Sequence, residues 1–454
     1  MESCSSSFHV AFLAVPFGSH ASVLFSLARH LATSLPSGTF SFFSTARSNS
    51  GLVRSNNLWP TNLRSYDVHD GLPDGALQLS PLEEIDLFLG LVPGNFSERM
   101  MAVEEESGRI TCVVSDGFWG FAGDLAMERG ALWVSYWNSA PTALLAHLCT
   151  DLLRQSAGTD GDRARAQDAL ESIPGLSSLR IEDLPEGIVL SDTTSSLALQ
   201  LHHMSQMITN AAAVVLNSFE GLDPTLDTQF QTKFKRCLNI MPFSLLSSNQ
   251  SKVDDEHGCL AWLDSQVAGS VVYISFGSSA LPPKEELVEI AEGLQASATP
   301  FLWSLKEIAW GHLPADFLDY VASRGLVVPW APQPQVLEHS AVGAFLTHSG
   351  WNSVLESITA GVPMILRPFF GDQQLDARVV SDVWKIGVGF EGGVIKKDEI
   401  ANALNVILGS KRGKTMKEKI NELKSIALQA IKPGGSSTKN LNALEKLVAS
   451  CQRS

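Results

Sequence analysis

The sequence predicts an α/β protein with two facing, doubly wound domains, each built on a parallel β-sheet covered by helices. Its 454 residues are too many for one ordinary hydrophobic core. In both halves, short and continuously apolar segments alternate with helical patterns, which is typical of buried parallel strands. A polar, pattern-free segment at 242–258 separates the halves. We therefore expect a first domain at 1–242, a linker at 243–258, a second domain at 259–432 and a C-terminal helix at 433–454 packing back toward the first domain.

The individual elements follow from the same alternation. In the first half, the predicted strands are 8–17, 39–45, 110–116 and 131–137, and the predicted helices are 22–33 and 119–130. In the second half, strands are predicted at 270–278, 300–305, 325–332, 342–348 and 362–368, with helices at 283–297, 351–361 and 372–384. The tail is predicted to be helical at 415–432 and 437–450. Ligands of such domains bind outside the carboxyl ends of the strands, here in the cleft between the domains.

Composition excludes several classes of function. The hydrophobic fraction of 44% and charged fraction of 18% describe a soluble globular protein. The net charge of −15 argues against nucleic-acid or anionic-membrane binding, because both need a basic surface. The six cysteines are scattered without metal-binding spacing, and the apolar N-terminal segment lacks a basic leader. We expect a cytoplasmic protein with reduced thiols and no membrane insertion.

The segment THSGWNSVLESITAGVP at 347–363 predicts an anion site. His348, Ser349 and Gly350 lie where an apolar strand ends and a helix starting near Trp351 begins. The unpaired N–H groups of such a helix end carry about half a positive charge and bind phosphate. Gly350 would let the backbone approach a ligand closely. The alternative is an ordinary strand-to-helix turn capped by the Ser349 side chain.

The helix of this segment adds polar side chains on one face. Asn352, Ser353 and Glu356 share a face by their spacing. A carboxylate one turn inside a phosphate-binding helix is well placed to accept both ribose hydroxyls, which indicates a nucleoside diphosphate. The glycine patterns of dinucleotide-binding and P-loop proteins are missing from the sequence.

The longer segment WAPQPQVLEHSAVGAFLTHSGWNSVLESITAGVPMILRPFFGDQ, residues 330–373, resembles the signature box of plant UDP-sugar-dependent glycosyltransferases acting on small natural products. The resemblance covers essentially the whole chain. The segments PFGSHA, FSFFST, SYDVHDGLP and LNSFEGLD are most similar to the flavonoid 3-O-glucosyltransferase branch. It implies the GT-B fold, with two Rossmann-like domains, the second binding UDP-sugar and the first binding the acceptor.

The resemblance also implies roles for donor-binding residues. Trp330 would stack on uracil, where it could otherwise be a core residue, and the Ala331 backbone would read the base edge. Polar residues would bind the rest of the donor: Gln333 and Glu356 the ribose, His348, Asn352, Ser353 and Ser278 the diphosphate, and Asp372 and Gln373 the sugar. The further donor-side candidates are Ser19, Asn138, Gly350 and Trp351. Gln373 is typical of glucose users, whereas some galactose users have His there.

His20 and Asp116 are the candidate catalytic pair. Transfer of a sugar to a hydroxyl needs a base and a stabilised leaving diphosphate. His20 stands between the first strand and a helix, and a helix N-terminus disfavours imidazolium, so the ring should accept a proton. Asp116 ends another strand and could orient it. From position alone, His20 could simply pack a loop and Asp116 could cap a helix. The resemblance implies that both are catalytic.

A single displacement with no enzyme nucleophile predicts inversion, from an α-linked donor to a β-glucoside. UDP-glucose would be the co-substrate, and we expect no cofactor and no metal, because no D-x-D motif follows a strand at the predicted cleft. We expect a monomer.

The acceptor is expected to be a flat phenolic compound, glucosylated at the 3-hydroxyl of a flavonol or anthocyanidin. Its candidate contacts are Gly18, Leu82, Phe118, Trp137, His147 and Phe370, each of which could instead belong to the core. Three residues depart from the family: Asn138 where close relatives usually have Thr, Leu82 where some have Gln, and Ser349 where Cys is common. There are two alternatives. The first is an enzyme of the same fold that acts on another phenolic or terpenoid acceptor or forms a C-glycoside. The second is a protein that binds a nucleotide sugar without turnover.

Overall fold

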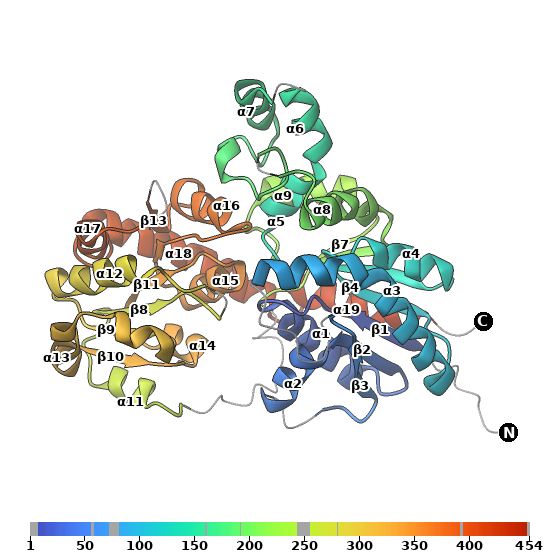
Figure 1. The fold of residues 1–454 in the computed structure, drawn as a ribbon, viewed down its shortest axis with the longest axis horizontal. Helices are drawn as coiled ribbons and strands as arrows, with labels where there is room; N and C mark the ends of the chain where they lie inside the picture. Colours follow the sequence, from blue (N-terminus) through green and yellow to red (C-terminus); the bar gives the residue numbers. More distant parts are fainter. Residues whose placement is uncertain are drawn as a thin grey trace. The chain divides into compact units, whose positions relative to one another are not determined.

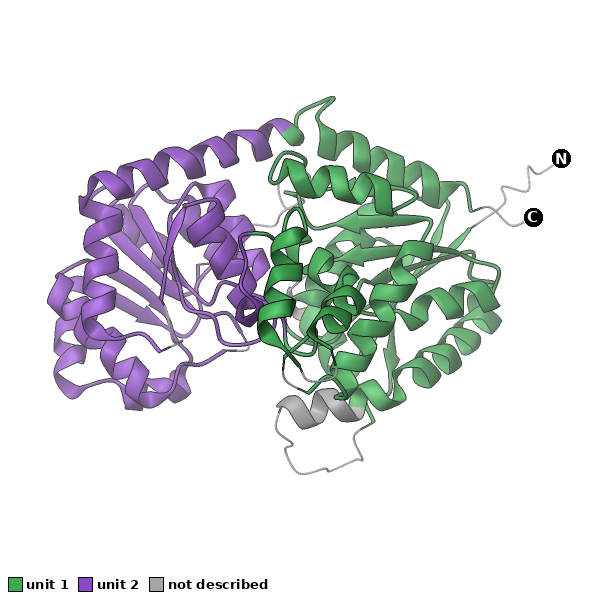
Figure 2. Cartoon of the chain, turned by 90° about the horizontal axis from the view of Figure 1, so that it is seen from above, with its two compact units in different colours: residues 1–177, 186–247, 430–454 green, residues 178–185, 248–429 purple. Residues whose placement is uncertain are grey.

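The structure is a computed structural model that describes residues 8–55, 59–71, 81–158, 161–190, 192–242, 255–278, 280–390 and 394–451, without the side chains of 53–55, 81–87 and 318. The chain forms two compact units (Figure 2). Unit 1 comprises residues 1–177, 186–247 and 430–454, and unit 2 comprises residues 178–185 and 248–429.

Unit 1 is built on a parallel sheet that has seven strands within the described residues, in the order β3-β2-β1-β4-β5-β6-β7. Figure 1 labels β1 to β4 of this sheet. The strands are β1 (His9–Leu13), β2 (Thr39–Thr45), β3 (Leu63–Val68), β4 (Cys112–Asp116), β5 (Leu132–Trp137), β6 (Ala213–Leu216) and β7 (Cys237–Asn239). Every residue of β1 and β4 is buried, so these central strands are covered on both faces.

The helices of unit 1 connect these strands in chain order. They are α1 (His20–Ser34), α2 (Ala46–Ser55), α3 (Pro81–Ser107), α4 (Phe121–Glu128), α5 (Pro141–Leu148), α6 (Thr150–Ala157), α7 (Arg163–Ser172), α8 (Ser196–Met207), α9 (Pro224–Lys233) and α19 (Ser436–Ala449). Of these helices, α19 does not connect two strands but comes from the C-terminal end of the chain. The Ser437 hydroxyl donates to the Met241 carbonyl oxygen at 2.6 Å, and His30 Nε2 lies 2.9 Å from Glu445 Oε1, which fastens α19 to unit 1.

Unit 2 repeats the design with a parallel sheet in which the described strands number six, ordered β10-β9-β8-β11-β12-β13. The strands are β8 (Val271–Ser275), β9 (Phe301–Ser304), β10 (Gly325–Val328), β11 (Val342–Thr347), β12 (Met364–Leu366) and β13 (Gly387–Gly389). The helices are α11 (Cys259–Asp264), α12 (Lys284–Ser297), α13 (Ala315–Arg324), α14 (Gln333–Glu338), α15 (Trp351–Ala360), α16 (Gln373–Arg378), α17 (Lys397–Gly409) and α18 (Lys411–Ala430). The short segment 178–185 belongs to this unit through Asp183, which accepts from Arg378 Nε at 3.0 Å.

These observations confirm the predicted parallel, doubly wound organisation, with differences at element ends. The strand predicted at 8–17 ends at Leu13, and the following helix begins at His20. The strand predicted at 325–332 ends at Val328 because Pro329 follows it. The helix predicted at 372–384 changes to a π-helical turn at Val379–Val383. No helix in the described part of the chain is long and apolar enough to cross a membrane.

Each sheet has one point where the chain order reverses. In unit 1 the reversal lies between β1 and β4, and in unit 2 it lies between β8 and β11. Ligands of open α/β sheets bind at such switch points, outside the carboxyl ends of the strands, because the connections diverge there and leave a crevice. The residues that follow these four strands are therefore the first place to look for a site in each unit.

Candidate active-site residues in the two units

The switch point of unit 1 brings His20 and Asp116 together. Gly18 has a φ of +58° and turns the chain after β1, so that His20 becomes the first residue of α1. Asp116 is the last residue of the neighbouring β4 and is fully buried. His20 Nδ1 lies 2.8 Å from Asp116 Oδ2, and Asp116 Oδ1 accepts from the Phe118 N–H at 3.0 Å. The N-cap of α4 is Gly120, so Asp116 does not cap that helix.

This geometry suits proton transfer. Both oxygens of Asp116 are engaged, which fixes the carboxylate and lets it orient the His20 ring. A neutral His20 that donates its Nδ1 proton to Asp116 presents Nε2 as the proton acceptor. The charge of Asp116 also acts on its surroundings: burial and then this carboxylate raise the pKa of Tyr136.

A row of rings leads from His20 into the core of unit 1. The Phe118 ring centroid is 4.7 Å from that of His20, Trp137 is 5.4 Å from Phe118, and His147 is 5.9 Å from Trp137. Phe118 is half-buried, whereas Trp137 and His147 are buried, as the core alternative for these two residues requires. Burial lowers the pKa of His147 to about 4. Of these three rings, Phe118 is the one that directly contacts His20.

Two further unit 1 candidates, Asn138 and Ser19, follow strands at the same sheet edge. Asn138 directly follows β5, and it is buried and accepts from Asn217 Nδ2 at its side-chain oxygen (3.0 Å) and at its carbonyl (3.2 Å). The sequence did not single out Asn217. Ser19 is exposed at the N-cap of α1. Leu82 lies outside the residues whose side chains the structure describes, so its predicted acceptor contact stays a prediction.

In unit 2, the corresponding switch point holds His348 between two glycines. A Cβ atom on Gly350 would lie 2.3 Å from His348 Nε2, and one on Gly277 would lie 2.9 Å from His348 Cε1. The place that a side chain at Gly350 would take is therefore occupied by the imidazole of His348, while the predicted close approach of the Gly350 backbone to a ligand stays a prediction. Ser349 is buried at a φ of +66°, and the N-cap of α15 is Gly350, so the predicted alternative of a serine-capped turn is wrong.

The N-terminus of α15 carries uncharged hydrogen-bond donors. Burial lowers the pKa of His348 to about 4, so the ring is uncharged near pH 7 and donates a single N–H. Within the described part of the chain, His348 Nδ1 has no hydrogen-bond partner although it is buried. Gly350 has no side chain to satisfy the first N–H groups of the helix. These groups are suited to phosphate oxygens.

A hydrogen-bonded group on α14 and α15 lies beside this helix end. Gln333 Nε2 donates to Glu356 Oε2 at 2.7 Å and to Ser353 Oγ at 2.9 Å, so Ser353 and Glu356 share one side of α15 as predicted. Tyr273, which the sequence did not single out, donates its hydroxyl to Gln333 Oε1 at 3.3 Å. Burial raises the pKa of Glu356 to about 7, against the opposing effect of the Gln333 hydrogen bond.

Two large aromatic residues of unit 2 are exposed near the same edge. Trp330 follows β10 and is 46% exposed, which excludes the core alternative, while the next residue, Ala331, is buried. Phe370 follows β12 and is 53% exposed. Exposed rings of this size are available for stacking on a planar ligand.

The segment between β12 and α16 carries the predicted sugar-binding residues. Gln373 Oε1 accepts from the N–H groups of Phe369 (2.9 Å) and Phe370 (3.3 Å), which fixes the orientation of the amide and leaves Nε2 as its donor end. Asp372 is half-buried at the N-cap of α16. Of the remaining donor candidates, Ser278 is exposed, Asn352 half-buried and Trp351 buried.

No group of three or more His, Cys, Asp or Glu side chains that could hold a metal occurs among the described residues. The polar groups described at the two switch points are imidazole, amide, hydroxyl and backbone N–H groups, and the carboxylates of Asp116 and Glu356, which accept hydrogen bonds.

Comparison with known sequences assigns the chain to a family. The sequence pattern of the family described as "UDP-glucoronosyl and UDP-glucosyl transferase" matches residues 97–433. The chain belongs to this family. It is a UDP-sugar-dependent glycosyltransferase, as the resemblance of residues 330–373 predicted.

Individual relatives of this glycosyltransferase are similar over nearly their whole length. A flavonol 3-O-glucosyltransferase of Arabidopsis thaliana is 46% identical over 441 residues, which are 96% of each chain. An anthocyanidin 3-O-galactosyltransferase of Actinidia chinensis var. chinensis is 45% identical, with 98% of each chain covered. A crystal structure of a UDP-glucose:anthocyanidin 3-O-glucosyltransferase in complex with UDP superimposes with a TM-score of 0.88 at 36% identity, covering 97% of this chain and 99% of that one. These likenesses confirm the GT-B fold.

Proposed function

We propose that the protein transfers glucose from UDP-glucose to the 3-hydroxyl of a flavonol or anthocyanidin and inverts the configuration at the anomeric carbon. The observation that carries the catalytic part is the 2.8 Å contact between His20 Nδ1 and Asp116 Oδ2 at the switch point of unit 1. The flavonoid acceptor is supported by relatives that are named flavonol and anthocyanidin 3-O-glycosyltransferases at 45–46% identity.

The proposed reaction is one displacement. His20 Nε2 takes the proton of the acceptor hydroxyl while the hydroxyl oxygen forms a bond to the anomeric carbon. The bond from that carbon to the diphosphate oxygen breaks, and UDP leaves with the electron pair. Asp116 stabilises the imidazolium that forms on His20. Attack from the face opposite the diphosphate converts the α-linked donor to a β-glucoside, and no metal or cofactor takes part.

The donor would be bound by unit 2. Trp330 would stack on uracil and Ala331 would read the base edge through its backbone. The hydrogen-bonded group of Gln333 and Glu356 would bind the ribose, which Glu356 can do as an acceptor when it is ionised. The diphosphate would be held by neutral donors at the strand ends and the start of α15: His348, Gly350, Asn352, Ser353 and Ser278. Asp372 and the Nε2 end of Gln373 would bind the sugar.

The acceptor would be bound beside His20. Phe118, whose ring contacts His20, is the best-supported contact for a phenolic ring, and Trp137 and His147 would support it from the core. Gly18, Leu82 and Phe370 are the further candidates. We also propose that the protein acts as a monomer in the cytoplasm.

The test is an acceptor and donor panel with purified protein. Flavonols, anthocyanidins, simple phenolics and terpenoid alcohols are assayed with UDP-glucose and with UDP-galactose, with and without EDTA, and the products are examined by NMR. We expect a flavonoid 3-O-β-glucoside, favoured over the galactoside and unaffected by EDTA. A C-linked product, a terpenoid glucoside as the best product, or donor binding without transfer to any acceptor would contradict the proposal.

A further inference from the structure

A buried ion pair lies directly behind the segment that carries the proposed sugar-binding residues. Arg367 follows β12, and Glu286 lies in the first turn of α12. Arg367 Nε donates to Glu286 Oε1 at 2.6 Å, and Nη2 donates to Oε2 at 2.7 Å, so the contact is bidentate. The side chains are 9% and 1% exposed, respectively. Two parallel charge-assisted bonds fix the guanidinium in orientation as well as in position.

The same arginine holds the start of the segment 368–373. Its guanidinium carbon lies 3.9 Å from the centroid of the Phe369 ring, and its Nη1 donates to the Pro368 carbonyl oxygen. Phe369 in turn packs edge-on against Phe276, which follows β8, with ring centroids 5.7 Å apart. The first two residues of the segment are therefore fixed in place by Arg367.

The end of the segment is fixed by its own last residue. Gln373 Oε1 accepts from the N–H groups of Phe369 and Phe370, which closes the segment into a compact turn. Gly371 has a φ of +68° at the tip, a conformation that glycine adopts without strain. The turn thus presents Asp372 and the Nε2 end of Gln373 from a backbone whose first residues are held by Phe369 and Arg367.

Stability alone does not account for an ion pair in this position. The desolvation of two buried charges commonly cancels their attraction, so a buried pair often contributes no more than apolar residues would. What such a pair supplies is a defined geometry. Glu286 Oε1 also accepts from the Ile395 N–H at 3.1 Å, so the carboxylate itself is held from two sides.

We propose that the Glu286–Arg367 pair positions the 368–373 turn so that Asp372 and Gln373 meet the hydroxyls of the donor sugar. Glu286 and Arg367 are then positioning residues for the recognition of the hexose, and they act without touching it. This proposal rests on the proposed donor roles of Asp372 and Gln373.

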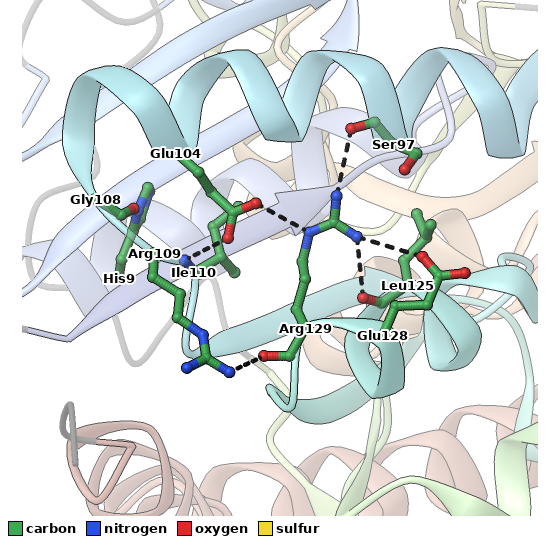
Figure 3. Close-up of polar contacts among 9 residues, drawn as sticks. All are labelled: His9, Ser97, Glu104, Gly108, Arg109, Ile110, Leu125, Glu128 and Arg129. Atoms are coloured by element: carbon green, nitrogen blue, oxygen red, sulfur yellow. Dashed lines mark hydrogen bonds and ion pairs between the residues drawn. The ribbon is translucent and has the colours of Figure 1, made fainter.

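Unit 1 offers a comparable, largely buried Arg–Glu pair for use as a control. Figure 3 shows Arg129 linked to Glu104 and to Leu125. Arg129 Nε donates to Glu104 Oε2 at 3.2 Å, and Nη1 donates to the Leu125 carbonyl oxygen at 3.1 Å. Glu104 Oε1 accepts from the Ile110 N–H at 2.9 Å, as Glu286 does from Ile395. The side chains are 9% and 20% exposed. Ile110 precedes β4, so this pair lies at the sheet edge remote from Asp116.

The test separates binding of the nucleotide from binding of the sugar. The variants are Arg367→Lys, which keeps the charge but loses the bidentate fork, and Glu286→Gln/Arg367→Met, which removes both charges together so that neither is left unpaired. The Kd values of UDP and of UDP-glucose are measured by calorimetry without acceptor, together with kcat/KM for UDP-glucose and UDP-galactose and the Tm. Glu104→Gln is the control.

For both Arg367 variants we expect the UDP Kd to stay within about twofold, while the UDP-glucose Kd rises about tenfold, as expected from the loss of one good sugar hydrogen bond. The ratio of kcat/KM for UDP-glucose to kcat/KM for UDP-galactose should be closer to one in these variants than in the wild-type protein. Glu104→Gln should lower the Tm and leave both Kd values unchanged. The proposal would be overturned if the Kd values of UDP and UDP-glucose rose equally or if neither changed. It would also be overturned if the Arg367→Lys variant bound UDP-glucose as tightly as the wild-type protein. Failure of the wild-type protein to bind UDP or to transfer sugar would instead overturn the proposed function.

Discussion

The two units place a histidine after a strand at their switch points and give it opposite surroundings. His20, after β1, contacts the buried carboxylate of Asp116 at the end of β4. His348, after β11, is enclosed by Gly277, which follows β8, and by Gly350. The pKa of His348 is lowered to about 4 by burial, so it is a neutral hydrogen-bond donor near pH 7.

The difference shows how one sheet design supports two kinds of chemistry. The topology determines where a histidine stands, because both follow strands that border a switch point. The residue on the adjoining strand decides what the ring can do. A carboxylate stabilises the protonated ring and suits a base, whereas glycines leave room for the ring but supply no counter-charge. The following predictions test this contrast.

His20→Ala should have the largest effect on transfer. We expect kcat to fall on the order of 100- to 10,000-fold, the typical contribution of a positioned base, while the UDP Kd stays within about twofold. Product formation is followed chromatographically and UDP binding by calorimetry. His348→Ala is the matched variant and should mainly weaken UDP binding. If His20→Ala turned over near the parental rate, His20 would not be the base, and the proposed difference in role between His20 and His348 would be wrong.

Glu356→Gln should raise the KM for UDP-glucose about 10- to 100-fold, because two hydrogen bonds from the ribose to a charged acceptor are weakened. The pKa of Glu356 is raised to about 7, and the ionised form is the better acceptor. The affinity of the wild-type protein for UDP-glucose should therefore increase as the pH rises through about 7 and then level off. The variant should lack this rise. Identical pH profiles for the two proteins would contradict the ribose role of Glu356.

Gly350→Ala should weaken UDP binding about tenfold, because the added methyl group would lie 2.3 Å from His348 Nε2 and displace the ring from the phosphate site. Gly409→Ala, also in unit 2, is the control, since a Cβ at Gly409 meets no atom within 4 Å. Calorimetric titration with UDP compares the two. Equal affinities would show that the position of His348 does not matter for the diphosphate.

Asp376→Asn should have the smallest effect, and on stability alone. Asp376 is buried, its oxygens have no hydrogen-bond partner within the described residues, and burial, followed by the charge of Asp372, raises its pKa well above the usual value. The folded state holds this proton more tightly than the unfolded chain, so stability from this group is present at acid pH and lost as the pH rises through the raised pKa. Asn at this position carries no titrating proton, so the variant should be spared this loss.

Thermal unfolding of both proteins between pH 5 and 8 checks this expectation. The Tm advantage of Asp376→Asn should grow with pH, whereas a constant or shrinking difference would mean that Asp376 is ionised throughout.

The sequence predicts the fold well where strands are buried on both faces. β1, β4, β8 and β11 are buried along all or nearly all of their length, and each was predicted because a short, mostly apolar segment lies between helical patterns. β3 was missed because its burial alternates, and β7 because it has only three residues. β6 was also missed, although its four residues are apolar and buried, because an apolar segment this short does not distinguish a strand from a piece of helix. β3 and β7 are the outermost strands of their sheet, where one-sided burial weakens the apolar pattern.

Some residues of the candidate site could be predicted from the sequence, and others could not. His20, Asp116 and Trp330 could be located because each follows or ends an apolar strand, and strand ends of a parallel sheet share one edge. The Glu286–Arg367 pair was missed because it joins residues 81 positions apart, and the only local signal is an arginine at the exit of an apolar strand. For Trp137 the sequence could not decide between a core residue and a ligand contact, because a tryptophan after an apolar strand is compatible with both.

Unit 1 is not contiguous in sequence. Its last stretch, 430–454, returns after the whole of unit 2, and α19 within it supplies the Ser437 hydroxyl for Met241 and the Glu445 carboxylate for His30. A truncation after residue 242 would therefore leave the first half without one of its own helices. Chimeras that exchange halves between members of the family have to transfer residues 430–454 together with the N-terminal half, and a simple two-piece exchange would pair α19 with a surface that did not evolve beside it.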